Sequence, residues 1–380
     1  MTEIYARIAG GVTQFEAEDW DRCAGTANPF TSHAFLAALE ESGSATAHEG
    51  WQPVPIAIHG DDGRPAAVMP AYVKSHSQGE YVFDQSWAAA YERAGGDYSP
   101  KLQIAVPFTP GPGRRLLTAD PDLAIALIGA AEAVVRESGL SSAHATFIAA
   151  EEVELFERAG WLIRIDSQFH WHNDAYSSFD DFLASLSSRK RKALRKERAA
   201  ALAGLAVEHV SGAGLTEAHW DAFWAFYQDT GSRKWGRPYL TRDFFSRLGE
   251  TMAERVLLVF ALRDGQPVAG ALNLIGEDTL YGRYWGTLVD LPHLHFEICY
   301  YQAIDAAIAR GLKRVEAGAQ GAHKLSRGYR PVPTWSAHFI ADPALRRAVA
   351  DYLEAERPAV LHEIDALDQM SPFRKGEGGA

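Results

Sequence analysis

The sequence predicts an α/β fold made of two similar halves, each a mixed sheet with helices packed on it. A length of 380 residues suits two domains of roughly 150–200 residues each. Hydrophobic residues make up 47% of the chain and charged residues 23%, as in globular proteins. Along both halves, segments with strand-like alternation are interspersed with segments of helical spacing, which indicates a sheet covered by helices.

The second half gives the clearer pattern. The turns Asp264-Gly265 and Gly276-Glu277-Asp278 are hairpin signals between apolar runs. Strands are predicted at 205–210, 256–263, 267–275, 279–287, 314–318 and 334–340. Helices are predicted from 216, after 241 and over 296–310, the last ending at Gly311.

The first half repeats this order loosely. Strands are predicted at 4–8, 54–59, 65–74, 102–108, 143–148 and 161–170, and helices at 15–22, 32–42, 121–137 and 151–159. A Trp/Tyr-rich segment at 84–100 interrupts the sheet. The similarity indicates duplication of one α/β unit. The expected domains are 1–172 and 205–345, with a basic helical connector at 173–204 and a C-terminal helix and tail at 346–380.

Composition excludes several classes of protein. The net charge of −12 argues against a protein that coats duplex DNA. Two cysteines, Cys23 and Cys299, are too few for a disulfide framework or a cysteine zinc cluster, and no metal is expected. The N-terminus has no apolar signal region, and the most apolar helix, 123–135, is too short to span a bilayer. A cytoplasmic location is therefore expected.

A strongly basic helix is predicted between the halves, at 187–203. Seven cationic side chains and one glutamate lie between residues 189 and 198. A solvated helix would place its charges opposite its apolar stripe, but Arg191 and Arg198 share the face of Leu194. The pattern favours an anionic partner bound by Arg191, Arg195 and Arg198, and a purely solvated face is the alternative.

The order of strands and helices resembles that of GCN5-related (GNAT) acyltransferases. Two such units beside a basic helix resemble the Fem-type peptidoglycan aminoacyltransferases. More closely, the chain resembles the FemAB-like N-acyltransferases of proteobacteria, once labelled peptidoglycan biosynthesis/recognition proteins, and is similar to some bacterial ceramide synthases. The strings that carry the resemblance are NPFTSHAFLAALEESGS (28–44), FDQSWAAAYERAGGDYSPKLQIAVPFTPGPGRRLL (83–117), SSRKRKALRKER (187–198), LYGRYWG (280–286), LHFEICYYQAI (294–304) and EAGAQGAHKLSRGYRPV (316–332).

This resemblance implies N-acyl transfer in a tandem GNAT-like fold. The donor would be acyl-CoA or another acyl thioester, and the acceptor an amine such as a long-chain amino alcohol. An aminoacyl-tRNA-dependent transferase and a non-catalytic module that recognises a glycan precursor or nucleic acid are the alternatives. Peripheral association with an anionic inner membrane is compatible with the basic helix.

Acyl transfer to an amine needs a base, donors for the oxyanion and a proton for the leaving group. His295 and Glu297 lie where a predicted strand gives way to a helix, a junction that faces the donor in GCN5-type folds. Glu316 lies on a core strand, where burial would raise its pKa. The proposed catalytic residues are His295, Glu297, Glu316, His323 and, as proton donor, Tyr284. Structural roles remain open, including a helix-dipole role for Glu297 and pairing of Glu316 with a nearby arginine.

Polar and aromatic residues elsewhere are candidates for binding. In the second half the candidate substrate-binding residues are Arg283, Trp285, Gln320, Lys324 and Arg327. In the first half they are Asp84, Trp87, Tyr91, Tyr98 and Lys101, all in the insertion. A Gly/Arg loop with Gly111, Gly113 and Arg114 is a candidate phosphate site, although it departs from the usual GCN5-type pyrophosphate loop and a Pro/Gly turn is the favoured explanation.

Overall fold

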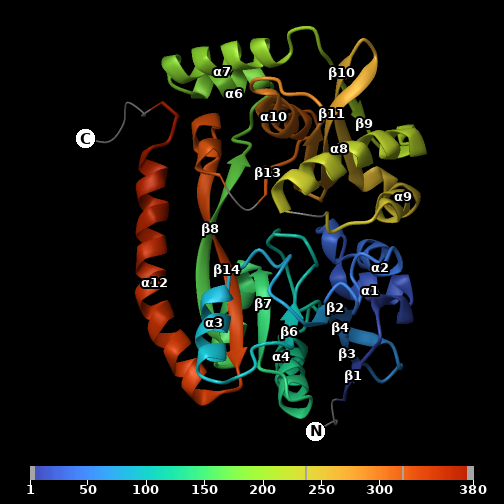
Figure 1. Ribbon diagram of the computed structural model, residues 1–380, viewed down its shortest axis with the longest axis vertical. Coiled ribbons are helices and arrows are strands. Elements are labelled where there is room, and N and C mark those ends of the chain that lie inside the picture. Colours follow the sequence, from blue (N-terminus) through green and yellow to red (C-terminus); the bar gives the residue numbers. More distant parts are fainter. Residues whose placement is uncertain (1–4, 236–237, 319–320, 375–380) are drawn as a thin grey trace. The chain divides into compact units, whose positions relative to one another are not determined.

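The computed structural model describes residues 5–235, 238–318 and 321–374, which pack into two compact units (Figure 1). The first unit contains Met1–Asp166, Tyr239–Phe244 and Pro333–His362, and the second Ser167–Pro238, Phe245–Val332 and Glu363–Ala380. The units interleave along the chain, whereas the sequence predicted contiguous domains. The boundaries at 172, 204 and 345 therefore stay predictions about independent folding.

The first unit contains two sheets. A small antiparallel sheet has the order β1-β3-β4, and a second series runs β2-β5-β6-β7-β14, with β6 and β7 parallel. The strands are β1 (Ala6–Ile8), β2 (Trp51–Pro53), β3 (Ile56–His59), β4 (Pro65–Met69), β5 (Ala71–Lys74), β6 (Lys101–Ile104), β7 (Ser142–Ile148), the first part of β8 (Leu162–His172) and most of β14 (Arg330–Ile340). The helices are α1 (Ala17–Ala24), α2 (His33–Glu41), α3 (Gln85–Arg93), α4 (Pro121–Glu137), α5 (Val153–Arg158) and most of α12 (Pro343–Gln369).

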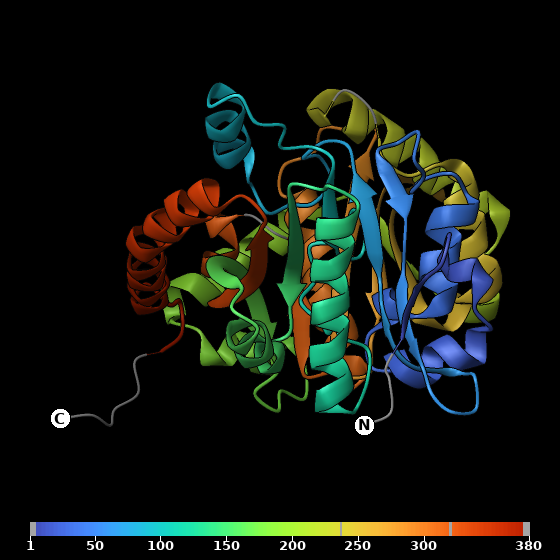
Figure 2. The same ribbon diagram turned by 90° about the horizontal axis from the view of Figure 1, so that it is seen from below.

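Helix α4 packs against strands of both sheets of the first unit (Figure 2). Asp120 caps its N-terminus by accepting from the N–H of Asp122, and proline occupies its first turn. The helix buries Leu127, Ile128 and Val135 against β6 and β7. This apolar stripe supplies much of the first unit's core.

The second unit has the strand order β8-β13-β12-β11-β10-β9. Its strands are β9 (Ala206–Val210), β10 (Val256–Arg263), β11 (Gln266–Ile275), β12 (Thr279–Thr287) and β13 (Arg314–Glu316), with the second part of β8. Its helices are α6 (Phe179–Ser185), α7 (Ser188–Ala201), α8 (Glu217–Trp235), α9 (Arg242–Thr251), α10 (Leu294–Phe296), a π-helical turn (Glu297–Tyr301) and α11 (Gln302–Ala309).

Helices cover both faces of this second sheet. On one face, Ile298 and Ile304 pack with Leu280 and Val315 in a single apolar cluster. On the other face, α8 lies close against β12. The approach is so close that a Cβ on Gly286 would come within 2.2 Å of the Phe226 carbonyl oxygen. Glycine at 286 is therefore required for the backbones to approach.

Four details differ from the sequence-based expectations. The strand predicted at 65–74 divides at Pro70 into β4 and β5, which belong to different sheets. The strand predicted at 102–108 ends at Ile104, before Pro107 and a left-handed Phe108. The helix predicted at 296–310 contains a π-helical turn, and α6 was not predicted. No helix among the described residues combines the length and apolar character needed to cross a bilayer.

Candidate active site

A pocket opens in the second unit where β13 ends beside β12. The two strands pair in parallel only over Thr279–Tyr281, and β12 continues to Thr287 after β13 has stopped at Glu316. The pocket has an empty volume of about 370 Å³, part of it open to solvent. Its lining includes Asn273, Arg283, Trp285, His295, Tyr300 and Ala317. Polar groups from a sheet and a helix thus meet at the end of a strand, where α/β folds place ligands.

A β-bulge shapes the sheet side of this pocket. Asn273 pairs with Gly282 and Leu272 with Tyr284, so Arg283 is an extra residue in β12. The bulge places Gly282 and Trp285 on the face of Asn273, and Tyr284 on the opposite face. There the Tyr284 ring lies 5.3 Å from the Tyr227 ring of α8. Tyr284, a predicted proton donor, is among the residues that line the pocket, although its ring packs against Tyr227 of α8.

The helix side carries two histidines and a tyrosine. The His295 ring lies 5.2 Å from the Trp285 ring and 5.3 Å from the Tyr300 ring. The Tyr300 hydroxyl lies 2.9 Å from Nε2 of His323, which is exposed at the start of the segment Ala322–Arg327. Partial desolvation, followed by the nearby cations Lys324 and Arg327, lowers the pKa of His323 and so favours the neutral imidazole. The structure thus brings the predicted His295 and His323 together through Tyr300.

Glu316 lies at the end of β13, one residue before the pocket-lining Ala317. It pairs in register with Tyr281 and with His170 of β8, which places the three side chains on one face. Burial raises the Glu316 pKa to about 7, although Arg314 and Arg283 oppose the shift. Its Oε1 lies 3.5 Å from Nε of Arg314, and its Oε2 has no hydrogen-bond partner among the described residues.

Sequence reasoning did not single out Asn273. The side chain is buried on β11, where Nδ2 donates to the Leu257 carbonyl over 3.2 Å. Its Oδ1 is buried and has no hydrogen-bond partner among the described residues. An asparagine inside the otherwise apolar run of β11 is the signal that would have found it, because a buried amide left half-satisfied is costly.

Glu297, a predicted base, lies in a buried ion pair. Its Oε2 accepts from Nε of Arg198 over 3.0 Å, and its Oε1 accepts from Nη2 of Arg198 over 2.8 Å. Nε2 of Gln302 also donates to Oε1 over 2.7 Å. Both carboxylate oxygens are therefore engaged, which favours a structural role for Glu297 and places Arg198 away from any external anion.

Two further predicted ligands also bond within the protein. Lys324 is buried, donates to the Gly318 carbonyl over 2.9 Å, and has its pKa lowered to about 8 by burial. Arg327 pairs with Glu197 over 2.8 Å. Gln320 lies outside the described residues.

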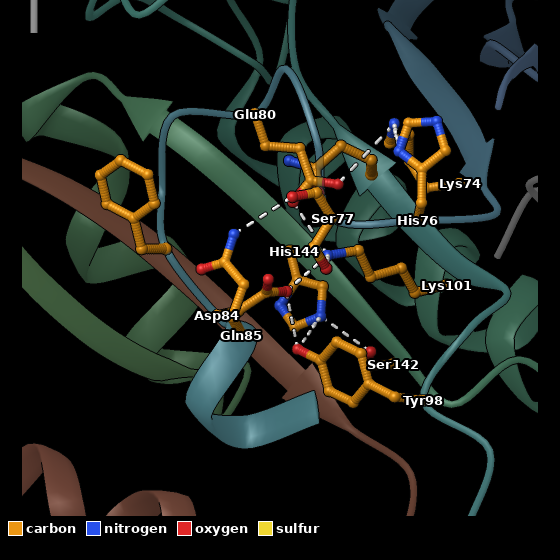
Figure 3. A network of polar contacts seen from close by, with 12 residues as sticks. Lys74, His76, Ser77, Glu80, Asp84, Gln85, Tyr98, Lys101, Ser142 and His144 are labelled. Carbon is orange, nitrogen blue, oxygen red and sulfur yellow. Dashed lines mark hydrogen bonds and ion pairs between the residues drawn. The ribbon is translucent and has the colours of Figure 1, made fainter. Parts of the chain in front are cut away.

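The predicted residues of the insertion form a closed network in the first unit (Figure 3). Nζ of Lys101 donates to Oε2 of Glu80 over 2.9 Å and also to Oδ2 of Asp84, which accepts from the Tyr98 hydroxyl over 2.8 Å. The Tyr98 hydroxyl also lies 3.3 Å from Nε2 of His144. Lys101 is fully buried. The network therefore holds the insertion against β6 and β7 from within.

Two aromatic residues of the insertion border this network. Trp87 is buried, with its ring 4.9 Å from the His338 ring. Tyr91 is half-buried and packs against the apolar cluster that contains Trp87 and Tyr98. The structure brings both close to Asp84, Tyr98 and Lys101, and the predicted role of these residues in binding substrate stays a prediction.

The Gly/Arg loop closes on itself. The N–H of Gly113 donates to the Phe147 carbonyl over 3.0 Å. Arg114 donates to the carbonyls of Leu116 and Thr118, and the buried Arg115 donates to that of Gly111 over 3.0 Å. These donors are engaged by the protein, which favours the Pro/Gly turn over the phosphate site.

Most of the cationic side chains of α7 are not neutralised by a buried carboxylate. Arg195 pairs over 2.8 Å with Asp180 near the surface, and Arg191 is half-buried. Together with four other cations, Arg191 forms no ion pair with the described residues; the four are Arg189, Lys190, Lys192 and Lys196. Among the residues that the structure describes, no three His, Cys, Asp or Glu side chains cluster as a metal site would require.

Comparisons with known proteins place this fold. A model of the FemAB-like family, described as peptidoglycan biosynthesis/recognition, matches residues 11–375. The crystal structure of FemX has a TM-score of 0.56 at 12% identity, covering 88% of this chain and 98% of that chain. The C-terminal domain of a putative lysylphosphatidylglycerol synthetase from Agrobacterium fabrum has a TM-score of 0.54 at 12% identity, covering 88% and 96%.

L-PGS from Bacillus licheniformis has a TM-score of 0.52 at 12% identity, covering 86% of this chain and 98% of that chain. No curated protein matches the sequence. These structures establish the fold alone at such identities, and they confirm the mixed α/β, Fem-type fold that the sequence predicted.

Proposed function

Because the chain belongs to the FemAB-like family, we propose that it is an N-acyltransferase that moves an acyl group from an acyl thioester to an amine. The observation that carries this proposal is the pocket beyond the end of β13, with His295 and Tyr300 on one side and Asn273 on the other. Nothing in this reaction requires a covalent enzyme intermediate, and the pocket supplies the acid and base groups that it does require.

In the proposed reaction the amine nitrogen attacks the thioester carbonyl carbon and the C–S bond breaks. His295 takes the proton that the amine loses. Tyr300 donates a proton to the departing thiolate and recovers one from solvent through His323, whose Nε2 lies 2.9 Å from its hydroxyl. The unpartnered Oδ1 of Asn273 accepts a hydrogen bond from the amine and orients it.

Glu316 is the second candidate base. Its burial and a pKa of about 7 suit proton abstraction near neutral pH, although its pairing with Tyr281 places the side chain on the sheet face opposite Asn273 and Trp285. His295 is favoured because it lines the pocket itself. Substituting each residue separately decides between them.

A second pocket offers room for an acyl chain. It shares Trp285 and His295 with the first pocket; Val289, Leu291 and Leu294 form its apolar part, and Thr230, Thr287 and Asp290 also line it. Its apolar part can hold hydrocarbon while the reacting carbonyl lies at His295. A thioester such as acyl-CoA or an acyl carrier fits this arrangement, and so does an amine acceptor as apolar as a long-chain amino alcohol.

The test is thiol release and product mass for the purified full chain with acyl-CoA of several chain lengths and a panel of amines, beside charged tRNA as the rival donor. We expect turnover with long-chain acyl-CoA and a loss of at least about 100-fold in His295→Gln. His48→Gln, at a highly exposed histidine, is the matched control and retains activity.

Other outcomes separate the alternatives. Transfer from charged tRNA alone would support a Fem-type aminoacyltransferase. Binding of a glycan precursor or nucleic acid without any turnover would overturn the enzyme proposal.

A further inference from the structure

The π-helical turn Glu297–Tyr301 lies directly beside the pocket. His295 precedes it by two residues, and Tyr300 lies within it. π-Helical turns are rare, and they occur often at functional sites because the extra residue redirects nearby side chains. The orientation of both His295 and Tyr300 therefore depends on how this turn is held.

Two consecutive residues of α7, Glu197 and Arg198, bond to the π-helical turn. The Arg198 guanidinium donates twice to Glu297, over 2.8 and 3.0 Å, and once to Asp305 over 2.7 Å. Its plane also lies 4.2 Å from the centre of the Phe179 ring. Gln302 spans the turn by donating to Glu297 over 2.7 Å. Position and orientation of the turn are thus fixed by a planar, two-pronged contact.

Glu197 makes a second contact of the same kind. Its Oε1 accepts from the Tyr301 hydroxyl over 2.6 Å and from Nη2 of Arg327 over 2.8 Å. The Arg327 guanidinium lies 3.4 Å from the centre of the Phe296 ring, the residue between His295 and the turn. The turn and the residue before it are held from α7 at two adjacent points.

The ion pair between Arg198 and Glu297 is expected to add little net stability to the fold. Glu297 is fully buried, and the desolvation of a buried ion pair offsets most of its Coulomb attraction. Apolar residues of similar volume would stabilise the contact equally well. What the charged pair adds is a defined direction for each bond, and hence a defined geometry for the turn.

We propose that Arg198 and Glu297 are positioning residues, which hold the π-helical turn so that His295 and Tyr300 face the pocket in reactive geometry. This inference rests on the proposed function of that pocket. It also assigns Arg198, predicted from sequence as an anion ligand, to the site's internal framework.

Arg198→Lys tests the proposal, because it keeps the charge and loses the two-pronged contact. We expect kcat to fall by about 10–100-fold with KM nearly unchanged, since misplacement of about 1 Å has effects of this size. The pH profile of kcat shifts as well. Arg330→Lys is the matched control, because Arg330 also pairs with a carboxylate, Asp174, over 3.0 Å and stacks on Phe373. We expect this variant to have wild-type activity.

A second variant covers loss of folding. Arg198→Leu with Glu297→Met removes both charges of the pair and leaves Asp305 and Gln302 without these partners, so its melting temperature is measured to establish that it is folded; we expect kcat to fall in the folded variant. A folded double variant with wild-type kcat, KM and pH profile would overturn the proposal.

An NMR titration of the histidine ring signals distinguishes this failure from failure of the proposed function. We expect the His295 and His323 signals to shift in both variants and to stay in place in Arg330→Lys, whether or not a donor is turned over. Unchanged signals would reject the positioning role. A wild-type protein without transfer activity but with these shifts would reject the function and retain the role.

Discussion

Glu316 shows at the scale of one residue how burial prepares a group for chemistry. The carboxyl lies at the end of β13, and its surroundings favour the neutral form up to a pKa of about 7. Arg314 stabilises the charged form at 3.5 Å without forming a hydrogen bond within normal geometry. A carboxyl balanced in this way can exchange a proton near neutral pH.

Glu316→Gln is expected to lower turnover by 10²–10⁴-fold if this carboxyl is the base, with substrate binding largely intact. Glutamine keeps the shape of the side chain and cannot take a proton. Steady-state kinetics beside a direct binding measurement give the answer. Full activity in the variant would leave His295 as the base.

The same substitution has a predicted effect on stability. Because the folded-state pKa is raised from 4.5 to about 7, the native state binds more protons than the unfolded state between these values. Glu316 therefore makes the free energy of unfolding decrease as pH rises through that window. Urea midpoints at pH 5 and pH 8 should differ less in Glu316→Gln than in wild type. Equal differences would show that Glu316 does not titrate in this range.

Residue types predicted the two histidines of the site, because imidazole is a common base at neutral pH. Asn273 and Tyr300 escaped prediction, since their roles depend on neighbours that are distant in sequence. Tyr300 reads as one more aromatic residue of an apolar helix until His323 is seen 2.9 Å from its hydroxyl. The ion pair of Glu297 could not be predicted for the same reason, as its partner Arg198 lies 99 residues away.

At the scale of elements, α7 combines two roles that its sequence did not separate. Glu197 and Arg198 turn inward, while Arg189, Lys192 and Lys196 are exposed. Periodicity predicted the helix well, with bounds of 187–203 against Ser188–Ala201. It did not distinguish inward from outward charges, because the surfaces that the inward charges contact come from other elements.

The exposed face of α7 predicts binding to an anionic membrane surface. Changing Arg189, Lys192 and Lys196 to Gln removes about 1 kcal/mol of attraction each, or roughly 100-fold in binding overall, at low salt. Sedimentation with phosphatidylglycerol vesicles measures this, and phosphatidylcholine vesicles are the control. Superimposable binding curves for wild type and variant would assign these charges to solvent. Arg198 is left unchanged because it belongs to the buried pair.

The Gly/Arg loop illustrates how a motif can serve structure. Arg115→Met would leave the carbonyls of Gly111, Gly113 and Thr146 without their donor. We expect a loss of roughly 3 kcal/mol in unfolding free energy with unchanged affinity for an acyl donor. Thermal melts and donor titration measure the two effects. Weaker donor binding at unchanged stability would restore the phosphate site.

Local patterns also explain where the strands were predicted well. The limits of β10, β11 and β12 agree with prediction within one residue, because each hairpin turn has a strong sequence signal. The bulge at Arg283 has no such signal, and the sequence did not predict it. The division at Pro70 was visible as a proline inside a predicted strand.

For the whole molecule, the sequence predicted two repeated units but not that each unit is built from separate segments of the chain. Residues 333–362 belong to the first compact unit, although the sequence placed them in or after a C-terminal domain. A repeated order of elements identifies similar halves. Pairing between strands that are nearly 200 residues apart leaves no local sequence pattern. The pairing of β14 with β7 is such a case.

Helix α12 gives the sharpest test of this long-range arrangement. Leu345, Val349 and Leu353 are buried in one cluster with Trp87 and Tyr98 of the insertion. Leu353→Asp places a charge in that cluster, and we expect it to lower the unfolding free energy by about 4 kcal/mol. Leu361→Asp, on the same helix at a position 42% exposed, is the control and should cost less than about 0.5 kcal/mol.

Urea unfolding followed by tryptophan fluorescence measures both variants, and Trp87, one of the ten tryptophans, lies in the cluster itself. If α12 were a tail added to an independent C-terminal domain, as the sequence suggested for 346–380, both aspartates would be tolerated equally. Similar midpoints for the two variants would therefore contradict the assignment of Pro333–His362 to the first unit. A selective loss in Leu353→Asp means that the end of the chain is required to complete the fold of its beginning.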